Sequence, residues 1–544
     1  MELRKGARCG APGELLLINN GYQHIKIWNF PTPPACGFLT PMTDAAAPPT
    51  ASPSPASAVD DEDTRLAEFG YTQKLDRSVG TLASFAIGFS TISATTAVFT
   101  GFGAGYFTAG APFVWTLLLA GAVFALWAAI AADLTAKIPL AGYAYQWTSR
   151  INGPSLGWFT GFVALMGWVC GMTGVGYILS GYLGGLFGWS MSQTAQILVA
   201  IGVVAICVLI NIFGVRFATM VNNIGVGLEL VITVGATILV GVIAFAAPDH
   251  HQPVSVLFTG GTSGDHSSYL LAWLAAALGP FFGLIGVESG ADVAEETKSA
   301  RHVVPRTMFY ALATSIVIEL LMYVVYVLAI RNADAVSANS SAPIEEIISQ
   351  QAGPVVTKIV VAVALTNILA CLLANILVAT RLTYSMARDN MLPLSHVWRH
   401  VSPTRRTPTY AVIGLGCLST ILLLSALVNE KAFNFIIGIA SLAFFSVYVL
   451  QTIGLIVGAR RGTIPVGEPG TFDLGRARMP LYIVALVVFI GVAVALIFLP
   501  QFAGNGWVFL GVIAVAAIWW ATGLRARLRR GDAGANFATK GQRQ

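Results

Sequence analysis

The hydrophobic pattern of the chain is a series of apolar runs separated by short polar segments. Each run has about 20 residues, the length at which a helix crosses a hydrocarbon core of roughly 30 Å. Only helices or closed barrels satisfy their backbone in lipid, and the short alternating segments of a barrel are absent. The pattern therefore predicts an all-α polytopic membrane protein with about 12 transmembrane helices, at 80–108, 112–132, 156–186, 193–213, 224–247, 268–292, 307–330, 355–380, 408–428, 433–458, 480–499 and 506–523.

Charge is scarce and falls almost entirely on one side of the predicted bilayer. The 544 residues are 56% hydrophobic and 10% charged, with a mean hydropathy of +0.72. From Met42 onward, 24 of the 27 Lys and Arg lie in segments on the same side as both termini. Basic residues mark the cytoplasmic side, so we expect both termini in the cytoplasm. The formal charge of +5 thus reflects topology, and we expect lipid contacts and no nucleic-acid partner.

The N-terminal segment has two unlike parts. Residues 1–41 have no signal-peptide pattern, and from Met42 the chain reads "MTDAAAPPTASPSPASAVDDEDTR", which is rich in Ala, Pro and Ser. We predict a disordered cytoplasmic tail over 1–79. Its true start is Met42 or, alternatively, residues 1–41 are a genuine flexible extension. A second cytoplasmic tail is predicted over 524–544.

The first and sixth spans carry residues that interrupt a helix. They contain "GFSTISATTAVFTGFGAG" (88–105) and "LGPFFGLIGVESG" (278–290). Proline removes a backbone donor, and glycine lowers helix stability. These spans open two successive sets of five, which enter the membrane from opposite sides. Paired interruptions in inverted halves indicate the midplane binding site of a secondary transporter. The alternative is a pair of packing kinks in an unrelated bundle.

Two acids lie well inside predicted spans. Glu229 occurs in "VNNIGVGLELVITV" (221–234), and Glu319 occurs in "SIVIELLMYVVY" (315–326). A carboxylate in a span is costly when charged and is usually neutral, paired or functional. We favour Glu229 as a group that takes up and releases protons, with a structural acid bonded to a neighbouring hydroxyl as the alternative. For Glu319 the structural interpretation is favoured.

Three stretches resemble motifs of the amino acid–polyamine–organocation transporters. The stretch "GPFFGLIGVESGADVAEETKSARHVVPR" (279–306) is similar to the sixth-helix signature of that family. The stretch "ADLTAKIPLAGYAYQWTSRINGPSLGWFTGF" (132–162) resembles the link between helices 2 and 3. The third pairs "ATRLTYSMARDNMLP" (379–393) with "RRTPTYAV" (405–412) and is similar to the loop after helix 8. The likeness is nearest to the amino acid, choline and γ-aminobutyrate permeases.

The resemblance implies a 5+5 inverted-repeat transport core with discontinuous helices 1 and 6 over residues 80–458, and two additional helices over 459–523. It also implies a permease that takes up amino acids or related amines by alternating access, with the small-molecule substrate bound at the two breaks. A phenylalanine in the second break is expected to act as a gate over the ligand. The implied substrate-binding residues are Ser93, Ala94, Thr95 and Thr96 in the first break, and Phe281, Phe282, Gly283, Leu284 and Ile285 in the second.

Two departures from the family pattern bear on the substrate and the coupling ion. Many members that carry α-amino acids have a glycine-rich first break whose bare backbone wraps the carboxylate, whereas this break reads "SATT". Some sodium-independent members have a lysine in helix 5 where this chain has Glu229. We therefore predict proton-coupled symport through Glu229, with exchange by the same fold as the alternative. Helix 6 carries no charge before Glu288, so no acidic pocket for a dication is evident.

Four acids follow the second break. Glu288, Asp292 and Glu295 are spaced i, i+4 and i+7, so they share one face of a helix. Basic residues such as Arg388 lie on the same side of the membrane. We predict Glu288 and Asp292 as gating residues and expect acids and bases there to close an inner gate. For Glu295 and Glu296 a solvated, charged helix end is the favoured interpretation.

Other classes of protein account for the sequence less well. A channel would be expected to repeat pore-lining rings, a sensor would need a soluble signalling domain, and an enzyme would need a catalytic constellation. None is evident, so we expect neither enzymatic activity nor a cofactor or metal site. The 23 Arg against 8 Lys are typical of a GC-rich bacterial genome, which predicts a multi-pass protein of the plasma membrane. Which amino acid or amine is carried is not indicated.

Overall fold

The computed structural model describes residues 55–263, 266–340, 342–427, 432–499, 504–535 and 537. Within them the regular secondary structure is helical, and 11 helices are long and apolar enough to cross a membrane. A further apolar helix, α17 (Thr409–Ser425), is shorter. Together these helices overlap all of the predicted spans. The prediction of an all-α polytopic protein with about 12 transmembrane helices is confirmed.

The spans are counted here in chain order. The first five are α2–α3 (Thr81–Ile92 and Ala94–Ala109), η1–α4 (Ala111–Trp115 and Thr116–Lys137), α6 (Pro154–Phe187), α7 (Gln193–Ile212) and α8–η2–α9 (Val215–Leu228, Glu229–Thr233 and Val234–Phe245). The next five are α11–α12–η4 (Tyr269–Ala276, Leu278–Gly283 and Val287–Glu296), α13 (Ala300–Leu328), α15 (Pro343–Arg388), α17 and α18 (Ala432–Arg461). The last two are α19 (Arg478–Phe498) and α20–η7–α21 (Asn505–Trp519, Trp520–Leu524 and Arg525–Arg530).

Short helices connect or flank these spans. They are α1 (Pro55–Glu68), α5 (Tyr143–Asn152), η3 (Pro248–His250), α10 (Val256–Thr259), α14 (Ala333–Ala338), α16 (Ser395–Trp398) and η5 (Gly475–Ala477). Of these, α5 lies in the predicted link between the second and third spans, and its side chains are largely buried. This link is therefore part of the packed bundle.

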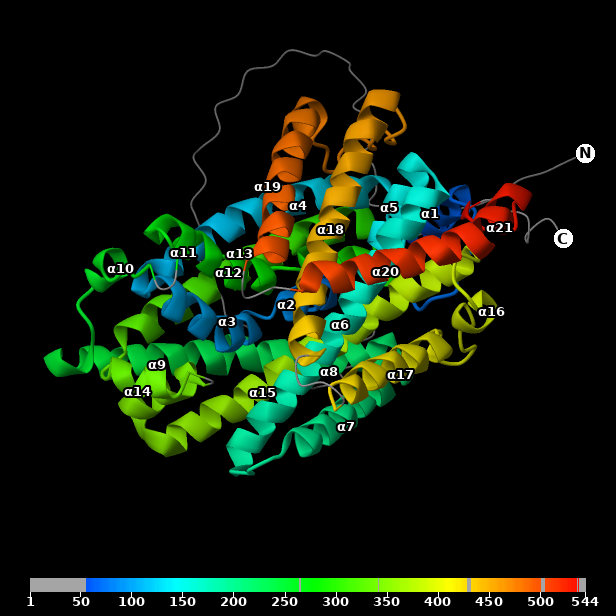
Figure 1. The fold of residues 1–544 in the computed structure, drawn as a ribbon. Helices are drawn as coiled ribbons and strands as arrows, with labels where there is room; N and C mark the ends of the chain where they lie inside the picture. Colours follow the sequence, from blue (N-terminus) through cyan, green and yellow to red (C-terminus); the bar gives the residue numbers. More distant parts are fainter. Residues whose placement is uncertain are drawn as a thin grey trace, which may run out of the picture. The chain divides into compact units, whose positions relative to one another are not determined.

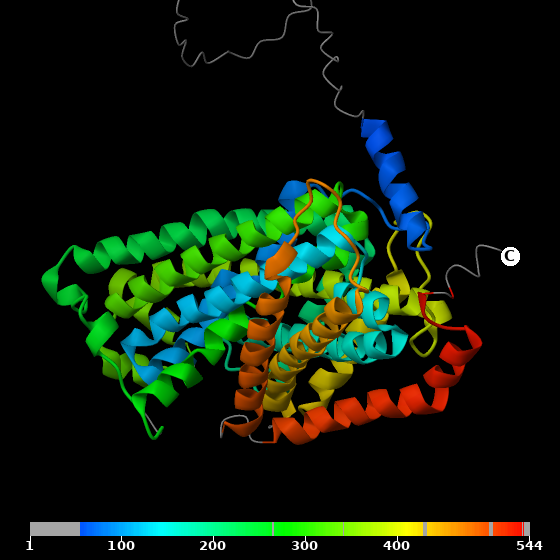
Figure 2. The ribbon, with the colours of Figure 1, turned by 90° about the horizontal axis from the view of Figure 1, so that it is seen from above.

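The first span is the most buried of the long helices. In its most apolar stretch 78% of the residues are buried, compared with 11% in the last span. The helices α2 and α12 lie in the middle of the bundle, while α20 and α21 run along its outer side (Figure 1, Figure 2). A helix that exposes apolar side chains over most of its surface suits contact with lipid. The interrupted helices are therefore shielded by the others.

Residues 55–79 differ from the disorder predicted for the N-terminal tail. They form α1, which projects from the other helices in Figure 2 (blue), and a segment that leads to α2. Arg65 of α1 pairs with Glu468 of the α18–α19 loop at 2.5 Å. Tyr71 is buried and donates to Asp389. Specific partners in the bundle thus order a segment whose composition alone favours disorder; residues 1–54 lie outside the described residues.

Candidate functional site at the breaks of spans 1 and 6

Span 1 is broken at a single residue, Ser93. Its φ of 46° lies in the left-handed region, which non-glycine residues rarely adopt. The Ser93 amide donates to the carbonyl of Phe89 and so ends α2. The Ser93 hydroxyl accepts from the Thr96 amide at 3.4 Å and lies 2.6 Å from the Thr96 hydroxyl, so it also caps α3. One residue therefore serves both ends of the interruption, through its backbone amide on the α2 side and its hydroxyl on the α3 side.

Span 6 is broken two to three residues later than the centre of the predicted break. The helix α12 ends at Gly283, and the 3₁₀ helix η4 begins at Val287. Between them Gly286 has a φ of 92°, which favours glycine because a Cβ strains the backbone there. A Cβ on Gly286 would also lie 2.6 Å from Cγ2 of Thr91 in α2. This glycine is required both by the turn and by the close approach of span 1.

The two breaks face each other. On the α3 side, a Cβ placed on Gly283 would lie 2.7 Å from Cβ of Ala97. On the α2 side, the corresponding contact joins Gly286 to Thr91. Two glycines of span 6 therefore let its backbone lie against span 1 directly above and below the Ser93 turn. Small residues permit such close packing of membrane helices. The predicted interruptions in both spans are confirmed, and they meet.

The residues predicted to bind substrate occupy different structural positions. Ser93 forms the turn, whereas Ala94, Thr95 and Thr96 are the first residues of α3. Phe281 is buried with its ring 6.2 Å from that of Phe124 and 6.0 Å from that of Phe445, so it packs between α4 and α18. The remaining residues of the second predicted break are Phe282, which is half-buried, and Gly283, Leu284 and Ile285, which are buried.

Glu229 reaches the break of span 1. Its carboxylate Oε1 accepts the backbone N–H of Thr95 at 3.0 Å, and the side chain is almost fully buried. The amide of Asn367 in α15 donates to the hydroxyl of Thr95 at 3.3 Å and to that of Thr233 at 3.1 Å. Residues Glu229–Thr233 form a π-helical turn, η2, a distortion that often marks functional sites. Spans 1, 5 and 8 are thus joined by one polar network around an acid.

The predicted gating acids are both fully buried. Glu288 Oε1 accepts from the hydroxyl of Tyr143 at 2.8 Å and from that of Tyr448 at 3.0 Å. Asp292 lies near the backbone N–H of Tyr143, but neither of its carboxyl oxygens makes a hydrogen bond of normal geometry with a described group. Neither acid forms an ion pair with a described residue. Glu288 therefore links span 6 to α5 and α18 through two tyrosines. The acids of η4 that form ion pairs are Glu295 and Glu296.

Glu295 and Glu296 are buried and ion-paired, which corrects the interpretation of a solvated helix end. Glu295 receives two hydrogen bonds from Arg388, at 2.8 and 2.9 Å, and one from the amide of Ala141 at 3.0 Å. Glu296 receives two from Arg381, at 2.7 and 2.8 Å, and both of these side chains are fully buried. Bidentate pairs of this kind are geometrically specific. They join η4 to the end of α15.

The ion pairs of η4 and the polar groups around them form one layer at this end of the bundle. The sequence did not single out two of its residues, Arg381 and Asp389. Arg381 lies within the "ATRLTYSMARDNMLP" stretch, and an arginine inside an apolar run is a signal of a buried partner. Asp389 accepts hydrogen bonds from the hydroxyls of Tyr71 and Tyr145 at 2.8 and 2.7 Å. Burial and the neighbouring Asp389 raise the pKa of both tyrosines, so they remain protonated donors. The basic end of the bundle is therefore closed by paired polar groups.

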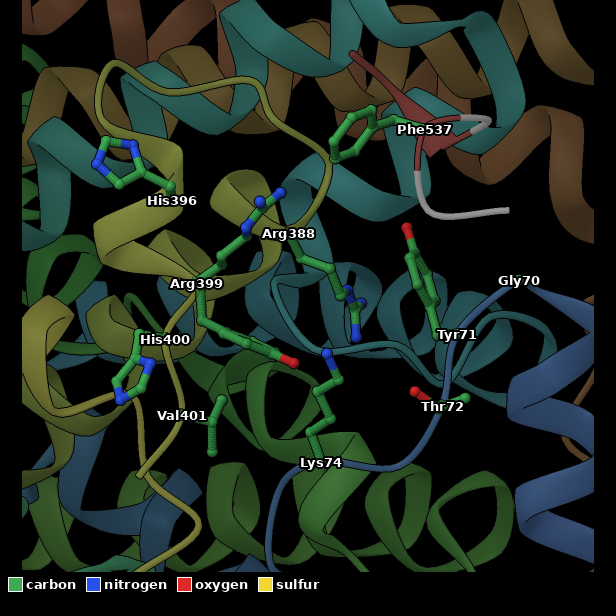
Figure 3. Close-up of a pocket in the computed structure, with 11 residues that line it drawn as sticks. Gly70, Tyr71, Thr72, Lys74, Arg388, His396, Arg399, His400, Val401 and Phe537 are labelled. Carbon is green, nitrogen blue, oxygen red and sulfur yellow. The ribbon is translucent and has the colours of Figure 1, made fainter. Parts of the chain in front are cut away.

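A basic pocket lies beside this layer. It has a volume of about 520 Å³, and Figure 3 shows Arg388 extending into it between Tyr71 and Lys74 on one side and Arg399 on the other. Its lining residues are Gly70, Tyr71, Thr72, Lys74, Tyr384, Arg388, His396, Arg399, His400, Val401 and Phe537. None of the residues at the two breaks lines this pocket. Among the described residues, no group of three His, Cys, Asp or Glu is placed to hold a metal ion.

A bundle of membrane-spanning helices whose two interrupted spans meet at buried acids defines the class: a transporter of small solutes. The model of the amino acid permease family matches residues 79–521, so the chain belongs to that family. It is a membrane transporter for amino acids or related amines.

Several relatives align along most of the chain. It is 24% identical to the amino-acid permease BAT1 of Arabidopsis thaliana over 458 residues, which cover 79% of this chain and 87% of that one. It is 23% identical to a putative polyamine transporter of Candida albicans, with 87% and 91% covered. It is 24% identical to the thiamine transporter thi9 of Schizosaccharomyces pombe, with 79% and 78% covered.

Proposed function

We propose that the protein takes up its solute across the plasma membrane by proton-coupled symport, with Glu229 as the residue that carries the proton. The single observation that supports this is the hydrogen bond from the Thr95 amide to Glu229, because it joins an acid within the membrane to the break of span 1. A solute bound at the break and a proton bound at Glu229 would then act on the same turn. Such shared contacts are what couples two ligands.

The chemistry of the N-terminus of α3 explains how the coupling would work. Backbone N–H groups at a helix N-terminus favour a negative charge, so the Thr95 amide stabilises Glu229 as a carboxylate. Protonation removes that charge and weakens the bond, which loosens the first turn of α3. The charge of Glu229 also acts on Cys371 of α15 and on Glu319 of α13. No described basic side chain is hydrogen-bonded to Glu229, so a proton is the simplest counter-charge.

The ion pairs of η4 supply a candidate inner gate. Positive-inside topology puts the Arg381 and Arg388 end of the bundle on the cytoplasmic side. Release of solute to the cytoplasm would then require η4 to move away from α15 and break both bidentate pairs. Glu288 and Asp292 lie between these pairs and the break, where Glu288 is held by two tyrosines. We expect Glu288 to release its tyrosine partners and Asp292 to gain a partner as the gate opens.

The names of the relatives bear on the solute. The three relatives are named for amino acids, polyamines and thiamine. Each of these solutes has a positively charged nitrogen, which is an ammonium in the first two and a thiazolium in thiamine. Symport of such a solute is the first candidate. Exchange of one amine for another is the second, because a permanently protonated Glu229 would serve it equally well.

Uptake in liposomes tests the proposal. Wild-type protein should accumulate solute against its gradient when the outside is acidic, while Glu229→Gln should abolish that accumulation and leave counterflow exchange measurable. Asp334→Asn, which alters an exposed acid of α14, is the matched control and should behave as wild type. If Glu229→Gln still accumulates solute in response to the pH gradient, Glu229 is not the coupling residue. If wild type shows counterflow alone, the protein is an exchanger.

A further inference from the structure

Glu319 in α13 is a fully buried acid that the coupling scheme does not use. Neither of its carboxyl oxygens has a hydrogen-bond partner within the described part of the chain. Its Oε2 lies 3.8 Å from the position of a Cβ on Gly283, the last residue of α12. A structural acid, which the sequence favoured, would be expected to bond a neighbour. Instead Glu319 points at the break of span 6.

Glu319 belongs to a row of polar side chains on one face of α13. Ser315, Glu319 and Tyr323 are spaced i, i+4 and i+8, and all three are fully buried. The hydroxyls of Ser315 and Tyr323 also lack described hydrogen-bond partners. The Tyr323 hydroxyl lies 3.4 Å from the position of a Cβ on Gly101 in α3. This row therefore runs along the two interrupted spans.

Unpartnered polar groups in such a place are unusual. A buried polar atom without a hydrogen bond costs about 1–3 kcal/mol, and an unpaired charge costs more. Neutralising Glu319 by protonation does not remove the problem, because its hydroxyl would still lack an acceptor. Native structures usually supply such groups with a partner, which a bound ion, a water or a ligand can provide. The carboxylate and the two hydroxyls of this row can all accept hydrogen bonds, so they suit a ligand that donates them.

The first break, by contrast, offers little to a carboxylate. Of the amides that open α3, Thr95 donates to Glu229 and Thr96 donates to Ser93. These are the groups that would otherwise bind the carboxylate of a zwitterionic amino acid, since helix N-termini are anion sites. While Glu229 is ionised, the protein's own oxygen atoms therefore occupy the amides that the carboxylate of such a substrate would use. It leaves an acid unpartnered on the opposite side of the break.

We propose that Glu319 binds the ammonium group of the carried solute, and that the solute is an organic amine with net positive charge instead of a zwitterionic α-amino acid. This rests on the proposed function, because it requires that the solute reaches the two breaks. An ammonium donates up to three hydrogen bonds. Glu319 accepts one or two, and the hydroxyl of Tyr323 is placed to accept another. The ring of Tyr323, with that of Phe113 at 5.0 Å, gives the cation an aromatic wall.

A matched series of four-carbon solutes tests the inference on the purified full-length protein. The series is 1,4-diaminobutane, 4-aminobutan-1-ol, 4-aminobutanoate and 1,4-butanediol, which differ in charge but not in chain length. Thermal shift and liposome uptake are measured for each. We expect both amines to stabilise the protein and to be taken up, with 4-aminobutanoate at least about tenfold weaker and the diol inactive. 4-Aminobutanoate keeps the ammonium, but its carboxylate would be buried without a hydrogen-bond donor, a penalty of about tenfold or more.

Variants of Glu319 separate binding from a structural role. Glu319→Gln should weaken 1,4-diaminobutane and 4-aminobutan-1-ol by about tenfold or more. It should weaken 4-aminobutanoate less, because the lost attraction to its ammonium is offset by the lost repulsion of its carboxylate, so the ratio of the affinities changes as well as their level. Asp334→Asn should leave every ratio at its wild-type value. If Glu319→Gln does not fold, Glu319→Asp is the substitute, because it keeps the charge on a side chain one methylene shorter. It should retain part of the affinity for the amines and change which chain length is preferred.

The outcomes distinguish this inference from the proposed function. Uptake of 4-aminobutanoate or other zwitterions in preference to the amines would overturn the inference and leave symport intact. The same holds if Glu319→Gln lowers all affinities equally. If none of the amines or amino acids is bound or carried, both the inference and the proposed function are wrong.

Discussion

Gly286 offers a direct test of how the two breaks pack together. Its φ of 92° is in the region where an L-residue is strained, and a Cβ there would approach Cγ2 of Thr91 to 2.6 Å. The next nearest atom is Cη2 of Trp168 at 3.3 Å. Gly286→Ala therefore has two separable effects, one on the backbone of the turn and one on the contact with α2.

The magnitude follows from these two terms. Placing a Cβ in a left-handed conformation costs roughly 1–2 kcal/mol. Overpacking of a tight contact typically costs about 1–3 kcal/mol. We expect Gly286→Ala to lower the free energy of unfolding by about 2–5 kcal/mol. Thr91→Ser removes the methyl group that the new Cβ meets and itself costs about 0.8 kcal/mol for the lost burial. In the double variant the contact term should largely vanish, while the backbone term remains.

The assay is thermal unfolding of the purified variants together with uptake in liposomes. Gly286→Ala should unfold at a lower temperature than wild type and transport poorly. The double variant with Thr91→Ser should recover part of the lost unfolding temperature and part of the lost transport. The size of the recovery measures the clash between the new Cβ and the methyl group of Thr91. Gly171→Ala is the control, because a Cβ on this residue of α6 meets nothing within 4 Å. If Thr91→Ser gives no recovery, the break of span 6 does not rest on α2 as described.

Two further changes test the other parts of the site. Arg381→Met leaves Glu296 buried without a cation and should destabilise the protein by about 3–5 kcal/mol, whereas adding Glu296→Gln should restore most of that stability; equal melting temperatures for wild type and Arg381→Met would refute the pairing. Ser93→Ala keeps the strained φ but removes the cap on the Thr96 amide, so it should lower thermal stability by about 1–2 kcal/mol. Ser93→Gly also lacks the cap but relaxes the backbone, so it should be the milder of the two; the reverse order would mean that the hydroxyl does not cap α3.

The positions of the spans and of their interruptions could be predicted because each depends on local composition. Run length sets where a helix crosses the membrane, and glycine or proline marks where it weakens. The details of the breaks depended on single residues. The sequence suggested four residues for the first break, but Ser93 alone makes the turn because its hydroxyl caps the following helix. The second break lies at Gly286, where the left-handed conformation is available, and not at the phenylalanines.

The partners of the buried acids could not be predicted in the same way. Glu296 and Arg381 are separated by 85 residues, and Glu295 and Arg388 by 93, so no local pattern links them. Their charge suggested exposure at a helix end, because isolated acids rarely lie buried. The crossing of η4 and α15 overrides that preference. For Glu319 the sequence favoured a structural acid, and the structure shows that its carboxylate has no described hydrogen-bond partner.

The distribution of partners along the site supports a division of labour among its acids. Glu295 and Glu296 are fully matched by bidentate arginines, which makes them suited to holding one conformation until the pairs break. A buried ion pair stabilises a protein little compared with apolar packing. Two adjacent pairs therefore suit a contact that forms and breaks during transport better than one that only stabilises the fold. Glu229 has an amide partner from a broken helix, which makes its bond sensitive to protonation. Glu319 lacks any described hydrogen-bond partner, and it is the one of these acids that can offer its full bonding capacity to a cation. The acids of the site therefore differ in their partners: arginines hold the two acids of the proposed gate, a backbone amide holds the proposed proton site, and no described group holds the proposed solute site.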